Sequence, residues 1–114
     1  MDTPLQHSDL IQKPGPIEVI EGVLAECLSL MKRKNNDYAG TTNFFKNLML
    51  CEHTEICSTE QGMMVRLSDK FSRLATLLGN SGTERAVFDE SIEDTLKDIV
   101  NYSLLLIAYR RTKQ

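Results

Sequence analysis

The chain lacks several features that mark other classes of protein. Its 114 residues contain no tryptophan and only three cysteines, and polar and apolar residues nowhere alternate over a strand-like length. No apolar run approaches the roughly 18 residues needed to cross a bilayer, and no signal peptide opens the sequence. An odd cysteine count without a secretory signal indicates reduced thiols rather than a disulfide framework. These absences predict a cytoplasmic, all-α protein with no membrane partner.

The chain also lacks an excess of positive charge. The net charge is -3 and the isoelectric point is near 5.3, which argues against a protein that binds extended nucleic acid through its phosphates. With 41% hydrophobic and 25% charged residues, the composition is that of an ordinary globular chain. We expect a flexible N-terminal arm over residues 1–15 and a single helical domain over residues 16–114.

The first half of the domain is expected to contain one long helix and one short helix. Apolar residues recur every three or four positions from residue 17 to about residue 34, and the turn formers of residues 35–40 interrupt that pattern. Thr41 or Thr42 can then cap a short helix that carries the apolar residues of 44–49.

The second half is expected to contain two long helices. A capping box over residues 58–61 predicts the start of one helix, which ends at Gly79. Residues 83–88 form a connector or an extra helical turn, and Asp89 is a plausible N-cap for the last helix. After Asn101 that helix is apolar on nearly every side, which requires burial on all sides. A single short chain provides little of that burial, so we predict a homodimer or homotetramer built on the C-terminal half.

An acidic stripe follows the predicted last helix. Glu90, Asp94 and Asp98 fall at i, i+4 and i+8, and Asn101 lies one turn further on. Like charges at i and i+4 cost a helix roughly 0.2–0.5 kcal/mol per pair. The stripe therefore needs a counter-charge, which a metal ion, a basic partner helix or water could supply.

A second polar stripe, formed by Arg66, Asp69, Lys70 and Arg73, lies on the preceding helix. The two stripes could neutralise each other as salt bridges on the surface of a helical bundle. Alternatively, they form a site for a polyanion, in which carboxylates hold Mg²⁺ while Lys70 and the arginines contact phosphates. The candidate metal ligands are Asp69, Glu90, Asp94 and Asp98.

The segment between the first two helices supplies groups that can contact a base or a sugar. Asp37, Tyr38 and Asn43 can hydrogen-bond or stack there, and a turn with local side-chain to backbone bonds is an equal alternative. The candidate nucleotide-binding residues are Asp37, Tyr38, Asn43, Arg66, Lys70, Arg73, Asn101 and Tyr102.

Cys51, His53 and Cys57 form a weak zinc pattern. Their spacing is irregular, and no second pair of ligands occurs elsewhere in the chain. Packing of small apolar side chains is the better explanation of the two cysteines.

Three short motifs occur in a recognisable order. Residues 34–40 read KNNDYAG, Arg66 to Arg73 carry the basic stripe, and residues 90–102 read ESIEDTLKDIVNY. Over residues 17–107 this order resembles a small MazG-like group of phages and bacteria, one branch of which is named the nucleotide modification associated domain. The resemblance implies the all-α nucleoside triphosphate pyrophosphohydrolase superfamily. Its helical protomers pair or form tetramers and cleave nucleotides between the α and β phosphates, using Mg²⁺ held by an acidic helix pair.

The acidic motifs of that superfamily are incomplete here. Asp98 matches the aspartate of the last-helix Glu-x-x-Asp motif, but Thr95 replaces its glutamate, for which Asp94 could substitute. The Glu-Glu-x-x-Glu motif of the preceding helix has no full counterpart, because Lys70 follows Asp69 where a further acid is expected. Replacing acids with cations weakens metal binding and strengthens phosphate binding.

Three functions are therefore expected, of which hydrolysis is the first. In a nucleotide pyrophosphohydrolase, Asp94 and Asp98, with Asp69 or Glu90, would bind Mg²⁺, one carboxylate would orient the attacking water, and Lys70 would offset charge on the leaving phosphates. The second function is a phage-type protein that sequesters a nucleotide signal without hydrolysing it, in the cytoplasm of a bacterial host. The third is a structural helical module whose two stripes are salt-bridged to each other.

Overall fold

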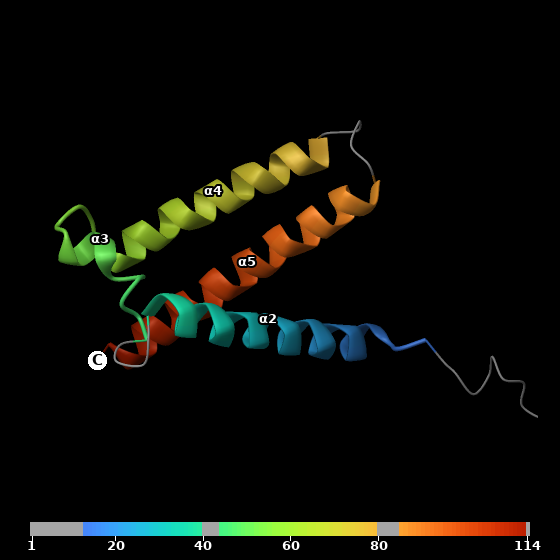
Figure 1. Cartoon of the computed structure of the whole chain (residues 1–114), viewed down its shortest axis with the longest axis horizontal. Helices are drawn as coiled ribbons and strands as arrows, with labels where there is room; N and C mark the ends of the chain where they lie inside the picture. Colours follow the sequence, from blue (N-terminus) through green and yellow to red (C-terminus); the bar gives the residue numbers. More distant parts are fainter. Residues whose placement is uncertain (1–12, 40–43, 80–84, 114) are drawn as a thin grey trace, which may run out of the picture.

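The computed structural model (Figure 1) describes residues 13–39, 44–79 and 85–113, with side chains for all of these except 36–39 and 85–88. Three long helices and one short helix make up this part of the chain, and no strand occurs in it, which confirms the all-α expectation. The helices are α2 (Pro16–Ala39), α3 (Leu50–His53), α4 (Thr59–Gly79) and α5 (Arg85–Thr112). None of these helices is both long enough and apolar enough to cross a membrane.

Helix α5 is the element around which the others pack. Helices α4 and α5 lie side by side and run in opposite directions, and α2 packs against the C-terminal half of α5 (Figure 1). The short helix α3 packs against α4. Near the C-terminal end of α5, the ring of Phe45 meets the ring of Tyr109 edge to face, with their centroids 5.7 Å apart. The segment between α2 and α4 is thereby attached to α5.

The apolar core of the described residues is small. Cys27 of α2, Met63 of α4 and Tyr109 of α5 are its buried apolar side chains. Many large apolar side chains remain exposed, including Leu104 and Ile107 in the segment of α5 that is apolar on nearly every side. Isolated exposed apolar residues are ordinary on a protein surface, but this number leaves most of the amphipathic faces without a covering layer.

The start and end of α4 follow the sequence signals. The N–H of Gln61 donates to Ser58 Oγ at 3.0 Å, and the N–H of Ser58 donates to Gln61 Oε1 at 3.1 Å. This reciprocal pair is the predicted capping box, which satisfies donors that have no partner within the helix. The last residue of α4 is Gly79, as expected.

Two predicted helix boundaries are wrong. Helix α2 continues through residues 35–39, where a break was expected, and ends at Ala39. Helix α5 begins at Arg85, so Asp89 lies within the helix and is not its N-cap. The preference of Asn and Asp for turns amounts to less than about 1 kcal/mol per residue, which packing against another helix readily overcomes. The structure agrees with the alternative prediction, an extra helical turn before Asp89.

The short helix also differs from its prediction. Residues 44–49 form turns, and the helix comprises only Leu50–His53. Thr41 and Thr42, the expected caps, lie outside the described residues. A four-residue helix has little stability of its own because its first turn fixes several residues for one hydrogen bond.

Candidate functional site

The main candidate site is a pocket of about 430 Å³ where α2, the segment before α3, α4 and α5 meet. Its volume lies within the range of roughly 300–1,000 Å³ that is typical of small-molecule sites. The lining residues are Met31, Lys34, Asn35, Asn47, Leu48, Leu50, Arg66, Asp98, Asn101, Tyr102 and Leu105. We call it the Asp98 pocket. It combines apolar walls with a few charged and amide groups.

The carboxylate of Asp98 is the centre of charge in this pocket. Lys34 Nζ of α2 lies 3.3 Å from Asp98 Oδ1, and Lys70 Nζ of α4 lies 3.0 Å from Asp98 Oδ2. The Asp98 side chain is only 21% exposed, so these ion pairs are less screened by water than ordinary surface pairs. Each oxygen of the carboxylate therefore has its own ammonium partner, and the two pairs join three helices.

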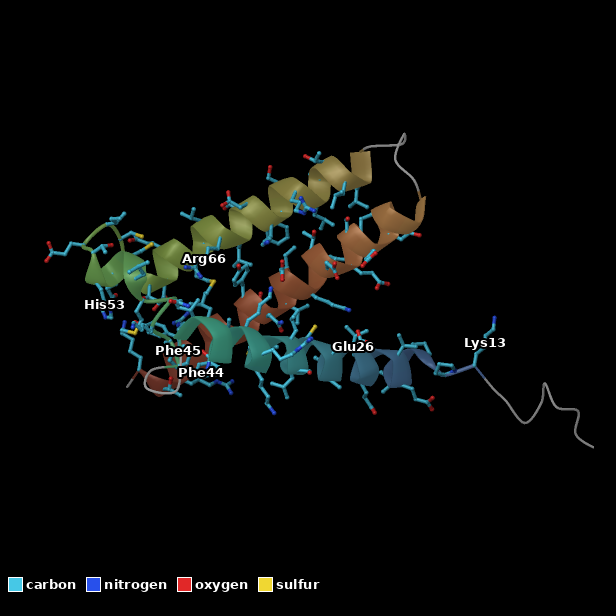
Figure 2. The ribbon with its side chains drawn as sticks, in the orientation of Figure 1. Lys13, Glu26, Phe44, Phe45, His53 and Arg66 are labelled. Carbon is cyan, nitrogen blue, oxygen red and sulfur yellow. The ribbon has the colours of Figure 1, made fainter. Side chains whose placement is uncertain are left out.

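Arg66 adds a third cation to the same region. Figure 2 shows this side chain on the side of α4 that faces the other helices. Its Nη2 donates to the carbonyl oxygen of Asn47 at 3.2 Å, which holds the guanidinium at the wall of the pocket. Because a guanidinium carries five N–H donors, this bond leaves others for a ligand.

Asn101 places a buried acceptor at the pocket. Its Nδ2 donates to the carbonyl oxygen of Cys27 at 3.0 Å, and because a carbonyl oxygen can only accept, this bond determines which way the amide points. The Asn101 side chain is buried, and its Oδ1 has no hydrogen-bond partner among the described residues. A buried polar atom without a partner costs about 1–3 kcal/mol. Because this oxygen is almost fully shielded from solvent, an N–H or O–H group of a ligand would remove that cost only after a small shift of the side chains around it.

A second hollow, of about 530 Å³, opens between α2 and α5 beside Asp94. Its lining residues are Ala25, Glu26, Ser29, Leu30, Arg33, Asp94 and Lys97. Lys97 Nζ lies 2.9 Å from Glu26 Oε2. The hydrogen bond that Lys97 donates to Glu26 is the main reason that the pKa of Lys97 is raised above its ordinary value of 10.5. In this Asp94 groove, acids and bases are equal in number.

The four candidate metal ligands are not gathered at one point. Asp98 lines the pocket and Asp94 lines the groove, while Asp69 and Glu90 are exposed and line neither hollow. In the described part of the chain, no group of three or more His, Cys, Asp or Glu side chains is placed to hold a metal ion. The residues at the pocket thus do not fit the Mg²⁺ site that the resemblance implies, which needs several oxygen ligands at one centre.

The candidate nucleotide-binding residues divide into three groups. Arg66, Asn101 and Tyr102 line the Asp98 pocket, and Lys70 is attached to it through its ion pair. Arg73 is exposed on α4 and lines neither hollow. The side chains of Asp37, Tyr38 and Asn43 lie outside the described part of the chain.

The pocket also contains polar residues that sequence reasoning did not assign to a site. Lys34 and Asn35 belong to the KNNDYAG motif but were not chosen, and Asn47 was missed. A signal for Lys34 was present, because it follows the buried Cys27 by seven residues and so lies on the same face of the helix. Nothing in the sequence around Asn47 indicated that its carbonyl oxygen would hold an arginine.

Comparison of the chain with protein-family models, with curated proteins and with solved structures finds no match.

Proposed function

We propose that this chain is a MazG-like nucleotide-binding protein that holds its ligand without hydrolysing it. The observation that carries this proposal is the state of Asp98, whose two oxygens are already bound by Lys34 and Lys70. A metal ion at this carboxylate would have to displace two ammonium groups. Asp98 of the acidic stripe thus already has its counter-charge, which two lysines supply.

The charge of the pocket supports binding of phosphates. Three cationic groups, Lys34, Arg66 and Lys70, surround the single carboxylate of Asp98. This local excess of positive charge occurs in a chain whose net charge is -3. Charge-assisted hydrogen bonds to phosphate oxygens are about twice as strong as neutral ones, and a guanidinium can make two of them in parallel.

The rest of the pocket supports a nucleoside rather than inorganic phosphate. Tyr102 offers an aromatic ring, and Leu48, Leu50 and Leu105 offer apolar walls on which a base can lie. The unpaired Oδ1 of Asn101 can accept a hydrogen bond from a base amino group or a sugar hydroxyl. The order of sequence motifs that resembles the MazG-like group independently favours a nucleotide.

Mg²⁺-dependent hydrolysis remains the competing prediction. It requires carboxylates that a protomer does not gather among its described residues, so we derive no catalytic step through a metal ion. The purely structural alternative is favoured by one observation, the interhelical ion pair between Lys70 and Asp98. It leaves the buried and unpaired Oδ1 of Asn101 unexplained.

The proposal includes a homo-oligomer. Ile17, Ile20, Leu24 and Leu28 follow one face of α2 at helical spacing, and each is between 48% and 65% exposed. A second copy of the chain, as a homodimer or homotetramer, is the proposed cover for this face, because a stable monomer rarely exposes a continuous apolar stripe. Light scattering after gel filtration should give an oligomer for the natural chain and a monomer for Leu24→Asp; a monomeric natural chain would contradict this part of the proposal.

A binding experiment without metal tests the proposed function. The chain is titrated with ribo- and deoxyribonucleoside mono-, di- and triphosphates in the presence of a chelator, and each ligand is then recovered after denaturation. We expect binding of at least one nucleotide and its recovery intact. Monophosphate or pyrophosphate products upon addition of Mg²⁺ or Mn²⁺ would establish hydrolysis instead. No thermal response to any nucleotide, with or without metal, would leave the structural alternative.

The variant Asp98→Asn separates binding from metal-dependent hydrolysis. Removing this charge releases two lysines for phosphate, so we expect nucleotide affinity without metal to rise by about two- to fivefold, the size of a partly exposed ion pair. A metal-dependent enzyme would instead lose activity. Asp94→Asn, one turn away in the Asp94 groove, is the matched control and should leave affinity unchanged.

A further inference from the structure

Cys51 lies in α3, and Cys57 lies in the tight loop that connects α3 to α4. The backbone N–H groups of Ile56 and Cys57 both donate to the carbonyl oxygen of Cys51, at 2.9 and 3.3 Å. Glu55, between them, has a positive φ of 61°, a conformation that turns the chain back sharply. A direct backbone hydrogen bond brings two residues close to the Cα separation of about 4.4–6.8 Å that a disulfide requires.

The two thiols also share one packing site. A Cβ atom added to Gly62 would lie 3.3 Å from Cys51 Sγ and 3.7 Å from Cys57 Sγ, so both sulfurs lie over the same bare stretch of α4. Gly62 is buried beneath the two thiols. No side chain at position 62 separates them, and the glycine allows their close approach.

The third cysteine, Cys27, differs from this pair in its burial. Cys27 is fully buried in α2, whereas Cys51 and Cys57 are only half-buried. A small oxidant in water can therefore reach the pair but not Cys27. Partial burial, together with the neighbouring Cys51 thiol, raises the pKa of the Cys57 thiol above its ordinary value of 9.0. The pair is thus expected to stay reduced until an oxidant is present.

A metal clip is the alternative use of these thiols. His53, the third residue of the sequence pattern, is exposed on α3, and Cys51, His53 and Cys57 form no group placed to hold a metal ion. Two thiolates alone do not complete the four-ligand site that zinc requires. Two adjacent thiols are sufficient for a disulfide.

We infer that Cys51 and Cys57 form an oxidisable dithiol, which small-molecule disulfides convert to an intramolecular disulfide. One protein thiolate attacks a sulfur of the small disulfide, whose S–S bond breaks, and the first small thiolate leaves and takes up a proton. The second protein thiolate then attacks the protein sulfur of the mixed disulfide and expels the second small thiolate, which takes up the other proton. The protein loses two electrons and two protons, and the small disulfide gains them. This site is independent of the proposed nucleotide pocket.

The test is oxidation of the full-length chain by glutathione disulfide, followed by alkylation and trypsin digestion. Trypsin cleaves after Lys46 and after Arg66, so both cysteines lie on one peptide. We expect that peptide to weigh two hydrogens less after oxidation and to resist alkylation until it is reduced. Cleavage at Glu52 or Glu55 then yields two pieces that remain joined only by the disulfide. Cys27 serves as the internal control and should become alkylated once the chain is unfolded.

Two further comparisons show whether the fold promotes the reaction. Ring closure should be faster by about tenfold or more in the folded chain than in denaturing urea, because pre-orientation raises the effective concentration of one thiol at the other. In Cys57→Ser, Cys51 should stop at the mixed disulfide with glutathione, and Cys51→Ser should leave Cys57 in the same state.

Other outcomes would overturn the inference. These are glutathione retained on both Cys51 and Cys57 of the natural chain, disulfides that join two chains or involve Cys27, and equal rates of closure in folded and unfolded protein. Failure to bind any nucleotide has no bearing on this test, so the two proposals can fail separately.

Discussion

Asp98 and Asp94 stand one turn apart on α5, yet the fold gives them different surroundings. Asp98 meets a lysine from α2 and a lysine from α4 beside a pocket with apolar walls. Asp94 lies in a groove where two acids, Asp94 and Glu26, are balanced by two bases, Arg33 and Lys97. The acidic stripe is therefore not one site. Only the surroundings of Asp98, which both α4 and the C-terminal end of α2 approach, have an excess of positive charge. The Asp98 pocket is therefore the part suited to an anion.

The largest expected effect is on nucleotide affinity. It comes from removing a cation at the Asp98 pocket and is compared with removal of a cation from the Asp94 groove. Lys70→Ala should weaken nucleotide binding by about 10- to 150-fold, since a hydrogen bond to a charged group contributes about 1.5–3 kcal/mol. Lys97→Ala removes the same charge from the Asp94 groove and should change affinity less than about twofold. Isothermal titration calorimetry without metal measures both. Equal losses in the two variants would contradict the assignment of the pocket.

A second prediction concerns the buried amide of Asn101, which has no counterpart in the Asp94 groove. Asn101→Ala should lower the free energy of unfolding by about 0.5–1.5 kcal/mol, because the hydrogen bond from its amide to the carbonyl oxygen of the buried Cys27 is lost. The exposed Asp94→Ala should stay within about 0.5 kcal/mol of the natural chain. Urea denaturation followed by circular dichroism provides both values. Similar stabilities for the two variants would show that the bond to Cys27 contributes little.

Asn101→Ala should also change ligand preference. If Oδ1 accepts a hydrogen bond from the base or sugar, the variant should lose affinity for the nucleotide but retain its affinity for inorganic triphosphate. A parallel loss for both ligands would mean that Asn101 acts only through the fold.

The smallest expected effect concerns the pH response of the groove. The raised pKa of Lys97 means that the ion pair with Glu26 stabilises the fold fully below pH 10.5, and that this contribution is lost as the pH rises through the raised value. Glu26→Gln should lower the Lys97 pKa, as followed by NMR of its side-chain nuclei. Glu21→Gln, which removes the same charge from another position on α2, is the control. An unchanged Lys97 titration in Glu26→Gln would contradict the cause given for the shift.

Much of the helical framework could be predicted from local patterns. Ser58 and Gln61 placed the start of α4, and Gly79 placed its end, because capping and chain reversal depend on a few adjacent residues. The C-terminal end of α2 and the start of α5 were placed wrongly. Residues 35–39 carry turn-forming side chains, but that preference is weaker than the packing of a long helix.

The candidate site was only partly predictable. Arg66, Lys70, Asp98 and Asn101 were chosen because their spacing puts them on two polar stripes, and the structure brings these four together. The contribution of Lys34 required knowledge of where α2 packs on α5. Helical spacing gives the face of a residue on its own helix, but not the partner that the face will meet.

The sequence by itself determined the helical class, the capping box and the presence of acidic and basic stripes, since each depends on periodicity along a few turns. Only the tertiary structure decided which carboxylate of the acidic stripe is paired with lysines. The packing of α2 and α4 on α5 brings two lysines to Asp98 and leaves Asp94 in a separate groove. That difference arises because an ion pair needs its atoms within a few ångströms of each other, and long-range packing sets those distances.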